Sequence, residues 1–170
     1  MNKKNIILIG MMGSGKTTVA KQLHKLLPDY RLIDLDQQIE IDHKQKISEI
    51  FDKNGEDYFR ALEAIALKGV LENQNQIIAS GGGIVLKDSN RELIKQKAFA
   101  VYLKTDLPVI FDRIKHSKNR PLLNTPHPQD VIKKLYSERS AFYESTSNLT
   151  IDTNHQAPEE IAQKIKNHLQ

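Results

Sequence analysis

The sequence predicts an α/β fold in three layers, in which a central five-stranded parallel sheet lies between two layers of helices. Short apolar segments alternate along the chain with longer segments whose apolar residues recur at helical spacing. Strands that alternate with helices favour a parallel sheet that is covered on both faces. The length of 170 residues fits one domain with a full core, so we expect residues 1–170 to form a single domain.

The elements follow one another in a regular order. Strands are expected at residues 5–9, 31–34, 76–80, 99–103 and 149–152. Helices are expected at residues 16–27, 37–43, 47–53, 56–73, 88–97, 107–116, 129–145 and 158–169. Residues 117–129 contain three prolines and little periodicity, which is typical of a functional or a disordered loop in a compact domain. We predict the functional version, a mobile lid at about residues 113–128.

Composition narrows the class of protein. The chain has no cysteine, which excludes disulfides and cysteine-ligated zinc and fits a reducing compartment. No apolar run approaches the roughly 20 residues that cross a membrane, so we expect a cytoplasmic protein with no membrane partner. The net charge of +4 comes from basic residues spread along the chain, without a basic tail. Nucleic acid is therefore not an expected partner.

A phosphate-binding loop follows the first predicted strand. Residues 10–17, GMMGSGKT, match the pattern G-x-x-x-x-G-K-[ST] between a strand and a helix, which is the context that the motif requires. Its backbone N–H groups and the helix N-terminus favour phosphate oxygens. Lys16 is expected to reach the β- and γ-phosphates, and Thr17 to bind Mg²⁺. The chain has no guanine-specific N-K-x-D element, which favours ATP.

Two aspartates follow the second predicted strand. The third strand ends without a carboxylate, so Asp34 and Asp36 are the nearest candidates for an acidic group at the crevice. At positions i and i+2 of an extended chain they would point the same way. We assign Asp34 to Mg²⁺ and Asp36 to an acceptor hydroxyl. The alternative is a turn with a helix cap, a role that Asp36 could combine with the first.

Several arginines are candidates for binding anions. Arg60 and Glu63, at i and i+3 of a predicted helix, could form a preorganised fork for a carboxylate ligand, although a surface pair has the same spacing. Arg139 follows the predicted lid, while Arg113 and Arg120 flank its start. A lid arginine could stabilise charge on a transferring phosphoryl group. Taken singly, each arginine is also compatible with a solvated surface position.

Three consecutive glycines, Gly81, Gly82 and Gly83, follow the third strand in the segment SGGG. Without side chains the backbone can approach a ligand closely and offer it N–H groups. This turn lies at the same sheet edge as the phosphate loop, so we expect it to contact the acceptor. A tight turn without a ligand is the alternative.

Together these elements resemble the shikimate kinase family along the whole chain. The shared segments, in order, are GMMGSGKTT, DLD, F-R-x-x-E, SGGG, RPLL, R-x-x-x-Y from Arg139 to Tyr143, and IDTN-x-x-x-P. The resemblance implies ATP-dependent phosphorylation of the 3-hydroxyl of shikimate in aromatic amino-acid biosynthesis, by a monomer with a P-loop kinase fold, a closing lid and bound Mg²⁺.

The resemblance also implies a set of site residues. It assigns ATP to Gly13, Ser14, Gly15, Lys16, Thr17, Thr18, Arg113, Arg120 and Pro158. It assigns shikimate to Asp36, Phe59, Arg60, Glu63, Gly81, Gly82, Gly83 and Arg139, within and around a helical region at about residues 36–62. Lys16, Asp36 and Arg120 would be catalytic, and Thr17 and Asp34 would serve Mg²⁺. Arg60 and Arg139 would hold the shikimate carboxylate, while Glu63 braces Arg60.

Two rival functions stay open at this level. Another small-molecule kinase of the same fold, for gluconate or a nucleoside monophosphate, would need similar arginines. A regulatory ATPase or a silent nucleotide-binding module would bind nucleotide without acceptor-dependent turnover. Whether Asp36 removes the hydroxyl proton or only orients the hydroxyl is also left open by the sequence.

Overall fold

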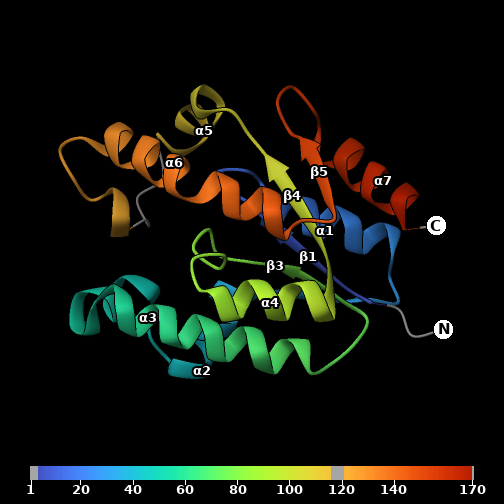
Figure 1. The fold of residues 1–170 in the computed structure, drawn as a ribbon, viewed down its shortest axis with the longest axis horizontal. Helices are drawn as coiled ribbons and strands as arrows, with labels where there is room; N and C mark the ends of the chain where they lie inside the picture. The colour runs from blue at the N-terminus through green and yellow to red at the C-terminus, as the bar shows by residue number, and fades with distance from the viewer. Residues whose placement is uncertain (1–3, 116–120, 170) are drawn as a thin grey trace.

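A five-stranded parallel sheet forms the centre of the computed structural model, which describes residues 4–115 and 121–169 (Figure 1). The strands are β1 (Asn5–Ile9), β2 (Arg31–Asp34), β3 (Gln76–Ala79), β4 (Ala98–Lys104) and β5 (Leu149–Asp152). They lie in the order β2-β3-β1-β4-β5, and every neighbouring pair is parallel. The predicted fold class is therefore confirmed.

Helices cover both faces of this sheet. They are α1 (Lys16–Leu26), α2 (Leu35–His43), α3 (Ile47–Leu71), α4 (Asp88–Lys97), α5 (Leu107–Ile114), α6 (Pro128–Thr146) and α7 (Pro158–His168). α1 and α7 lie side by side on one face, as Figure 1 shows. α3, α4, α5 and α6 contribute to the core on the other face. None of the helices in the described ranges is both long and apolar enough to cross a membrane.

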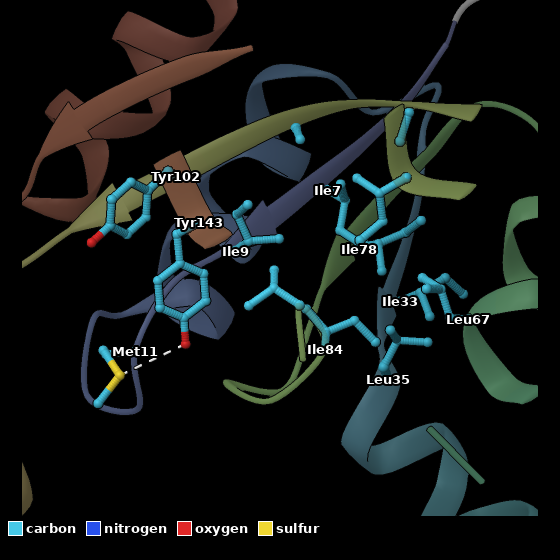
Figure 2. Packing of buried hydrophobic residues seen from close by; sticks show 14 of the residues in the cluster. Ile7, Ile9, Met11, Ile33, Leu35, Leu67, Ile78, Ile84, Tyr102 and Tyr143 are labelled. Atoms are coloured by element: carbon cyan, nitrogen blue, oxygen red, sulfur yellow. Dashed lines mark hydrogen bonds between the residues drawn. The ribbon is translucent and has the colours of Figure 1, made fainter. Parts of the chain in front are cut away.

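Strand β1 shows why the sheet needs two layers of helices. Ile6 and Leu8 pack with the residues of α1 and α7, whereas Ile7 and Ile9 belong to the cluster on the opposite face (Figure 2). All four side chains are fully buried. A strand with apolar residues on both faces has no solvent side, which is typical of central strands in a parallel sheet.

The strand order decides which loops meet. β1 lies between β3 and β4, so the phosphate loop after β1 emerges beside the glycine turn after β3. β2 pairs with β3 on its other side and ends at Asp34. In open α/β sheets ligands bind at the carboxyl ends of the strands. Three of the predicted site segments therefore share this edge.

Most predicted elements match the structure within two residues. The helices predicted at 47–53 and 56–73 correspond to the two parts of α3, Ile47–Leu71, which a non-helical Gly55 divides with a kink. Gly55 has φ 81° and ψ 174°, a conformation that glycine adopts at little cost. In the predicted lid, a short 3-10 helix (Pro121–Leu123) precedes α6, and residues 116–120 lie outside the described residues.

Candidate active site

A cavity of roughly 510 Å³ opens beside the glycine turn. Its volume is within the range of small-molecule sites. The cavity is lined by Met12, Asp36, Gln37, Glu40, Lys46, Ile47, Ser48, Phe51, Phe59, Arg60, Glu63, Gly81, Gly82, Gly83, Pro121, Leu122 and Arg139. This list includes all eight residues that the family resemblance assigned to the acceptor, although they come from segments spread over about 100 positions of the chain.

Arg60 projects into this cavity from α3 in a fixed orientation. Its Nε and Nη2 donate to Glu56 Oε1 at 3.2 and 2.9 Å, and its Nη1 donates to Glu63 Oε2 at 2.9 Å. A guanidinium has five N–H donors, so two remain without an acceptor among the described residues. The side chain of Arg60 is only 11% exposed. The pair is therefore not the solvated surface pair that the spacing also allowed.

Glu63 lies deeper than Arg60 and is 1% exposed. Its second oxygen, Oε1, is buried without a hydrogen-bond partner in the described chain. Burial raises the pKa of the Glu63 carboxyl, and the charge of Arg60 only partly opposes that rise. The pKa of Arg60 is also raised, because its two glutamate partners outweigh the effect of its own burial. Glu63 thus holds the Arg60 guanidinium in place from a buried position.

Arg139 reaches the same cavity from the other side, on α6. It is 2% exposed, which makes it one of the largest fully buried side chains. Its Nε is buried and has no partner among the described residues. An unpaired buried donor is costly, which favours a ligand with an acceptor oxygen at this position. Arg60 and Arg139 thus present hydrogen-bond donors to one cavity.

The glycine turn packs against these side chains so tightly that a β-carbon would collide with them. A Cβ on Gly81 would lie 2.6 Å from Glu63 Oε1, and one on Gly83 would overlap the Arg60 guanidinium. Gly82 faces the phosphate loop, where a Cβ would be 3.4 Å from the backbone nitrogen of Met12. The three glycines therefore let the acceptor cavity and the phosphate loop approach each other.

The phosphate loop itself has the geometry of an anion site. Gly15 occupies the left-handed region with φ 90° and precedes α1, whose first N–H groups face the loop. Lys16 is buried, and its Nζ donates to the carbonyls of Gly10 and Met11 at 2.9 and 2.8 Å. The Ser14 hydroxyl is buried and has no partner among the described residues. Gly13, with φ 79°, packs on α5.

The two aspartates do not point the same way, so the expectation based on an extended chain is wrong. Helix α2 begins at Leu35, and Asp34 caps it by accepting a hydrogen bond from the backbone N–H of Gln37 at 3.2 Å. The other oxygen of Asp34 accepts the Thr17 hydroxyl at 2.8 Å. Asp36, the second residue of the helix, lines the acceptor cavity instead. The capping role therefore belongs to Asp34.

A family model for shikimate kinase matches residues 12–170. The chain belongs to the shikimate kinase family. The shikimate kinase of Thermodesulfovibrio yellowstonii is 43% identical over 162 residues, which cover 95% of this chain and 92% of that protein.

Solved structures of shikimate kinases have the same fold. The shikimate kinase from Acinetobacter baumannii in complex with shikimate superposes with a TM-score of 0.95 at 36% identity, covering 98% of this chain and 93% of that one. The enzyme from Bacteroides thetaiotaomicron has a TM-score of 0.88 at 30% identity, with 98% of both chains covered.

Four further residues were assigned to the nucleotide by resemblance to shikimate kinases: Thr18, Arg113, Arg120 and Pro158. Arg113 donates to the carbonyl of Gly13 at 3.1 Å and to that of Thr153 at 3.3 Å, so it joins the phosphate loop to the segment after β5. Pro158 begins α7 at the end of that segment, and Thr18 is exposed in the first turn of α1. Arg120 lies outside the described residues.

Sequence reasoning missed part of the cavity wall. Ile47 and Phe51 line it from the first turns of α3, and Phe51 contacts Phe59 with ring centroids 4.9 Å apart. Their i, i+4 spacing could have signalled an apolar helix face, but that spacing is equally typical of core residues. Glu40 and Lys46 also line the cavity and form an ion pair at 3.0 Å between α2 and α3.

Proposed function

We propose that the cavity beside the glycine turn binds shikimate and that the phosphate loop binds the ATP that phosphorylates it. As a member of the shikimate kinase family, the chain is an ATP-dependent phosphotransferase whose acceptor is the 3-hydroxyl of shikimate. One observation supports the assignment of residues above all others. Two buried arginines with unpaired donors line one cavity whose glycine wall packs against the phosphate loop.

Each side of the acceptor cavity has a distinct part in binding. Arg60 and Arg139 hold the shikimate carboxylate through charge-assisted hydrogen bonds, the stronger class of such bonds. Phe59 covers a face of the ring, and its own ring lies 5.3 Å from the Arg60 guanidinium. Asp36 accepts a hydrogen bond from a ring hydroxyl. The glycine turn lets the ring lie directly against the backbone.

The reaction moves one phosphoryl group between two oxygens. The 3-hydroxyl oxygen forms a bond to the γ-phosphorus while the bond from that phosphorus to the β,γ-bridging oxygen breaks, which gives shikimate 3-phosphate and ADP. The hydroxyl proton leaves to a base or to solvent. Because the transition state is loose, alignment and charge neutralisation matter more than proton removal. Lys16 supplies positive charge beside the phosphates, and the loop N–H groups bind their oxygens; Arg120 is assigned to them as well.

Mg²⁺ fits the pair formed by Thr17 and Asp34. Their oxygens are 2.8 Å apart at the start of α1, and the two groups are the hydroxyl and carboxylate that this cation accepts. Bound Mg²⁺ would neutralise charge on the β- and γ-phosphates. Two protein ligands are enough, because Mg²⁺ usually keeps waters and takes its other ligands from the nucleotide.

The wider assignments belong to the same proposal. Residues 1–170 form one domain in which the region at about 36–62 binds the acceptor and the segment at about 113–128 closes over it. Pro121 and Leu122 support the assignment of the closing segment, since they line the cavity. We also propose that the enzyme is cytoplasmic, in keeping with the absence of cysteine, and that it acts as a monomer, as the family resemblance implies.

An ADP-release assay tests the function. The enzyme is supplied with ATP and Mg²⁺ in four reactions that contain shikimate, gluconate, AMP or no acceptor. We expect ADP release that depends on shikimate alone. Equal release in all four reactions would contradict a kinase, and release with gluconate or AMP alone would replace the acceptor.

A further inference from the structure

Tyr143 on α6 lies where the phosphate loop and the glycine turn meet. Its side chain is fully buried, and its ring stacks on Tyr102 with centroids 5.1 Å apart. In Figure 2 the hydroxyl points away from this stack toward Met11, whose Sδ lies 3.7 Å from it. The same hydroxyl donates to the carbonyl of Gly82. Its single proton goes to that carbonyl, because a thioether sulfur is a weak acceptor.

The contacts of Gly82 explain why this bond matters. A Cβ at Gly82 would lie 3.4 Å from the Met12 nitrogen, 3.6 Å from the Gly10 carbonyl oxygen and 3.6 Å from Arg139 Nη1. Gly82 therefore lies between the phosphate loop and Arg139, which lines the acceptor cavity. Arg139 precedes Tyr143 by four positions, so both side chains leave the same face of α6. Helix α6 thus carries both Arg139, which we assign to the shikimate carboxylate, and Tyr143, which donates to the backbone carbonyl of Gly82.

Other carbonyls of this segment are held from a different helix. Ile84 accepts from Asn90 at 3.0 Å, and Val85 and Leu86 accept from Arg91, with all of these donors on α4. Gly82 alone among these four is held from α6. In a trans peptide the N–H points opposite to the carbonyl, so the bond to Gly82 also sets the direction of the next N–H, on the cavity-lining Gly83.

We propose that Tyr143 is a positioning residue of the phosphoryl transfer. Its hydroxyl holds the glycine turn against the phosphate loop, and this contact sets where the acceptor hydroxyl lies relative to the γ-phosphate. The inference rests on the proposed function. Alignment errors of about 1 Å caused by residues away from the chemistry can lower a rate roughly 100-fold. Burial also raises the pKa of Tyr143 to about 12, against the opposing charge of Arg139, so the hydroxyl keeps its proton at neutral pH.

The test compares two tyrosines in one stack. Tyr143→Phe keeps the ring and removes the hydroxyl, which leaves the Gly82 carbonyl without its donor. Tyr102→Phe is the matched control, because Tyr102 is equally buried and stacked but its hydroxyl interacts with Tyr136. We expect the kcat of Tyr143→Phe with shikimate to fall about tenfold, while the KM for ATP stays within about twofold of wild type. The kcat of Tyr102→Phe should match that of wild type.

Two further measurements separate positioning from packing. Melting temperatures test whether both variants are folded at the assay temperature, and amide hydrogen exchange reports on peptides that cover residues 80–86. Faster exchange there in Tyr143→Phe but not in Tyr102→Phe supports the proposal. Wild-type kcat in Tyr143→Phe, or an equal fall in both variants, would overturn it. If wild-type enzyme releases no ADP with shikimate, the proposed function fails first, and the inference fails with it.

Discussion

Arg60 and Glu63 form a buried ion pair, in which Arg60 Nη1 lies 2.9 Å from Glu63 Oε2 and the glutamate side chain is 1% exposed. The two residues are one helical turn apart on α3. Removing one partner of a buried pair leaves an uncompensated charge, which costs more than the pair contributes. The pair is thus a fixed part of the cavity wall, and changes at either residue should alter binding and stability together.

Replacing Arg60 should weaken acceptor binding more than nucleotide binding. Arg60→Ala removes a charge-assisted donor pair, so we expect the Kd for shikimate to rise about 10- to 100-fold. Titration calorimetry with shikimate, and separately with ADP, measures both affinities. Arg31→Ala, at an exposed arginine on β2, is the control and should change neither. An unchanged Kd for shikimate in Arg60→Ala would remove Arg60 from the site.

Glu63 should make stability depend on pH in a defined direction. Its pKa is raised by burial, so the folded state binds a proton more tightly than the unfolded state does. Stability from this group is therefore complete below its ordinary pKa of 4.5 and is lost as pH rises from 4.5 through the raised value. Each unit of raised pKa corresponds to about 1.4 kcal/mol.

The variant Glu63→Gln isolates this effect, since glutamine has the same shape and no charge to titrate. Urea unfolding of wild type and variant from pH 4 upward gives the difference between their free energies of unfolding. We expect that difference to shift in favour of the variant as pH rises. A shift in favour of wild type would mean that the pair with Arg60 dominates over burial.

Adding a methyl group to the glycine turn should displace the arginine fork. A Cβ at Gly83 would overlap the Arg60 guanidinium, so Gly83→Ala should force that side chain to move and raise the Kd for shikimate about tenfold. The Kd for ADP should stay the same. Gly69→Ala is the control, because Gly69 lies in α3 with open space around its Cβ position. The free energy of unfolding of Gly69→Ala should be about 0.5–1 kcal/mol higher than that of wild type.

The sequence predicts where the segments of this site lie in the fold better than it predicts the directions and burial of their side chains. The phosphate loop could be placed because its motif requires a strand before it and a helix after it. The directions of Asp34 and Asp36 could not, since they depend on where α2 begins, and the cap that Asp34 supplies starts it at Leu35. The i, i+3 spacing of Arg60 and Glu63 is the same in a surface pair, and only the packing of α3 beneath the glycine turn buries it.

Lys16 should be needed for turnover and not for the fold. Lys16→Ala removes the charge beside the proposed phosphate site, and loss of one preorganised donor typically costs about 100- to 1,000-fold in kcat. It also removes the Lys16 donor from the carbonyl of Gly10, a cost of roughly 1–3 kcal/mol, whereas the carbonyl of Met11 still accepts from the N–H of Ser14. Circular dichroism should show a folded protein. Lys25→Ala, at an exposed lysine near the end of α1, should keep wild-type turnover, and an active Lys16→Ala enzyme would contradict the assignment.

Asp34 should determine how much Mg²⁺ the enzyme needs. Asp34→Asn removes the charge but keeps a side-chain oxygen that can still accept from the N–H of Gln37, so α2 should remain capped. The neutral amide binds Mg²⁺ less well than a carboxylate, and we expect the Mg²⁺ concentration for half-maximal rate to rise about tenfold at fixed ATP. Asp42→Asn, at an exposed aspartate of the same helix, controls for lost surface charge. If both variants follow the wild-type Mg²⁺ curve, Asp34 acts only as a helix cap, and the proposal of a magnesium ligand at this position is wrong.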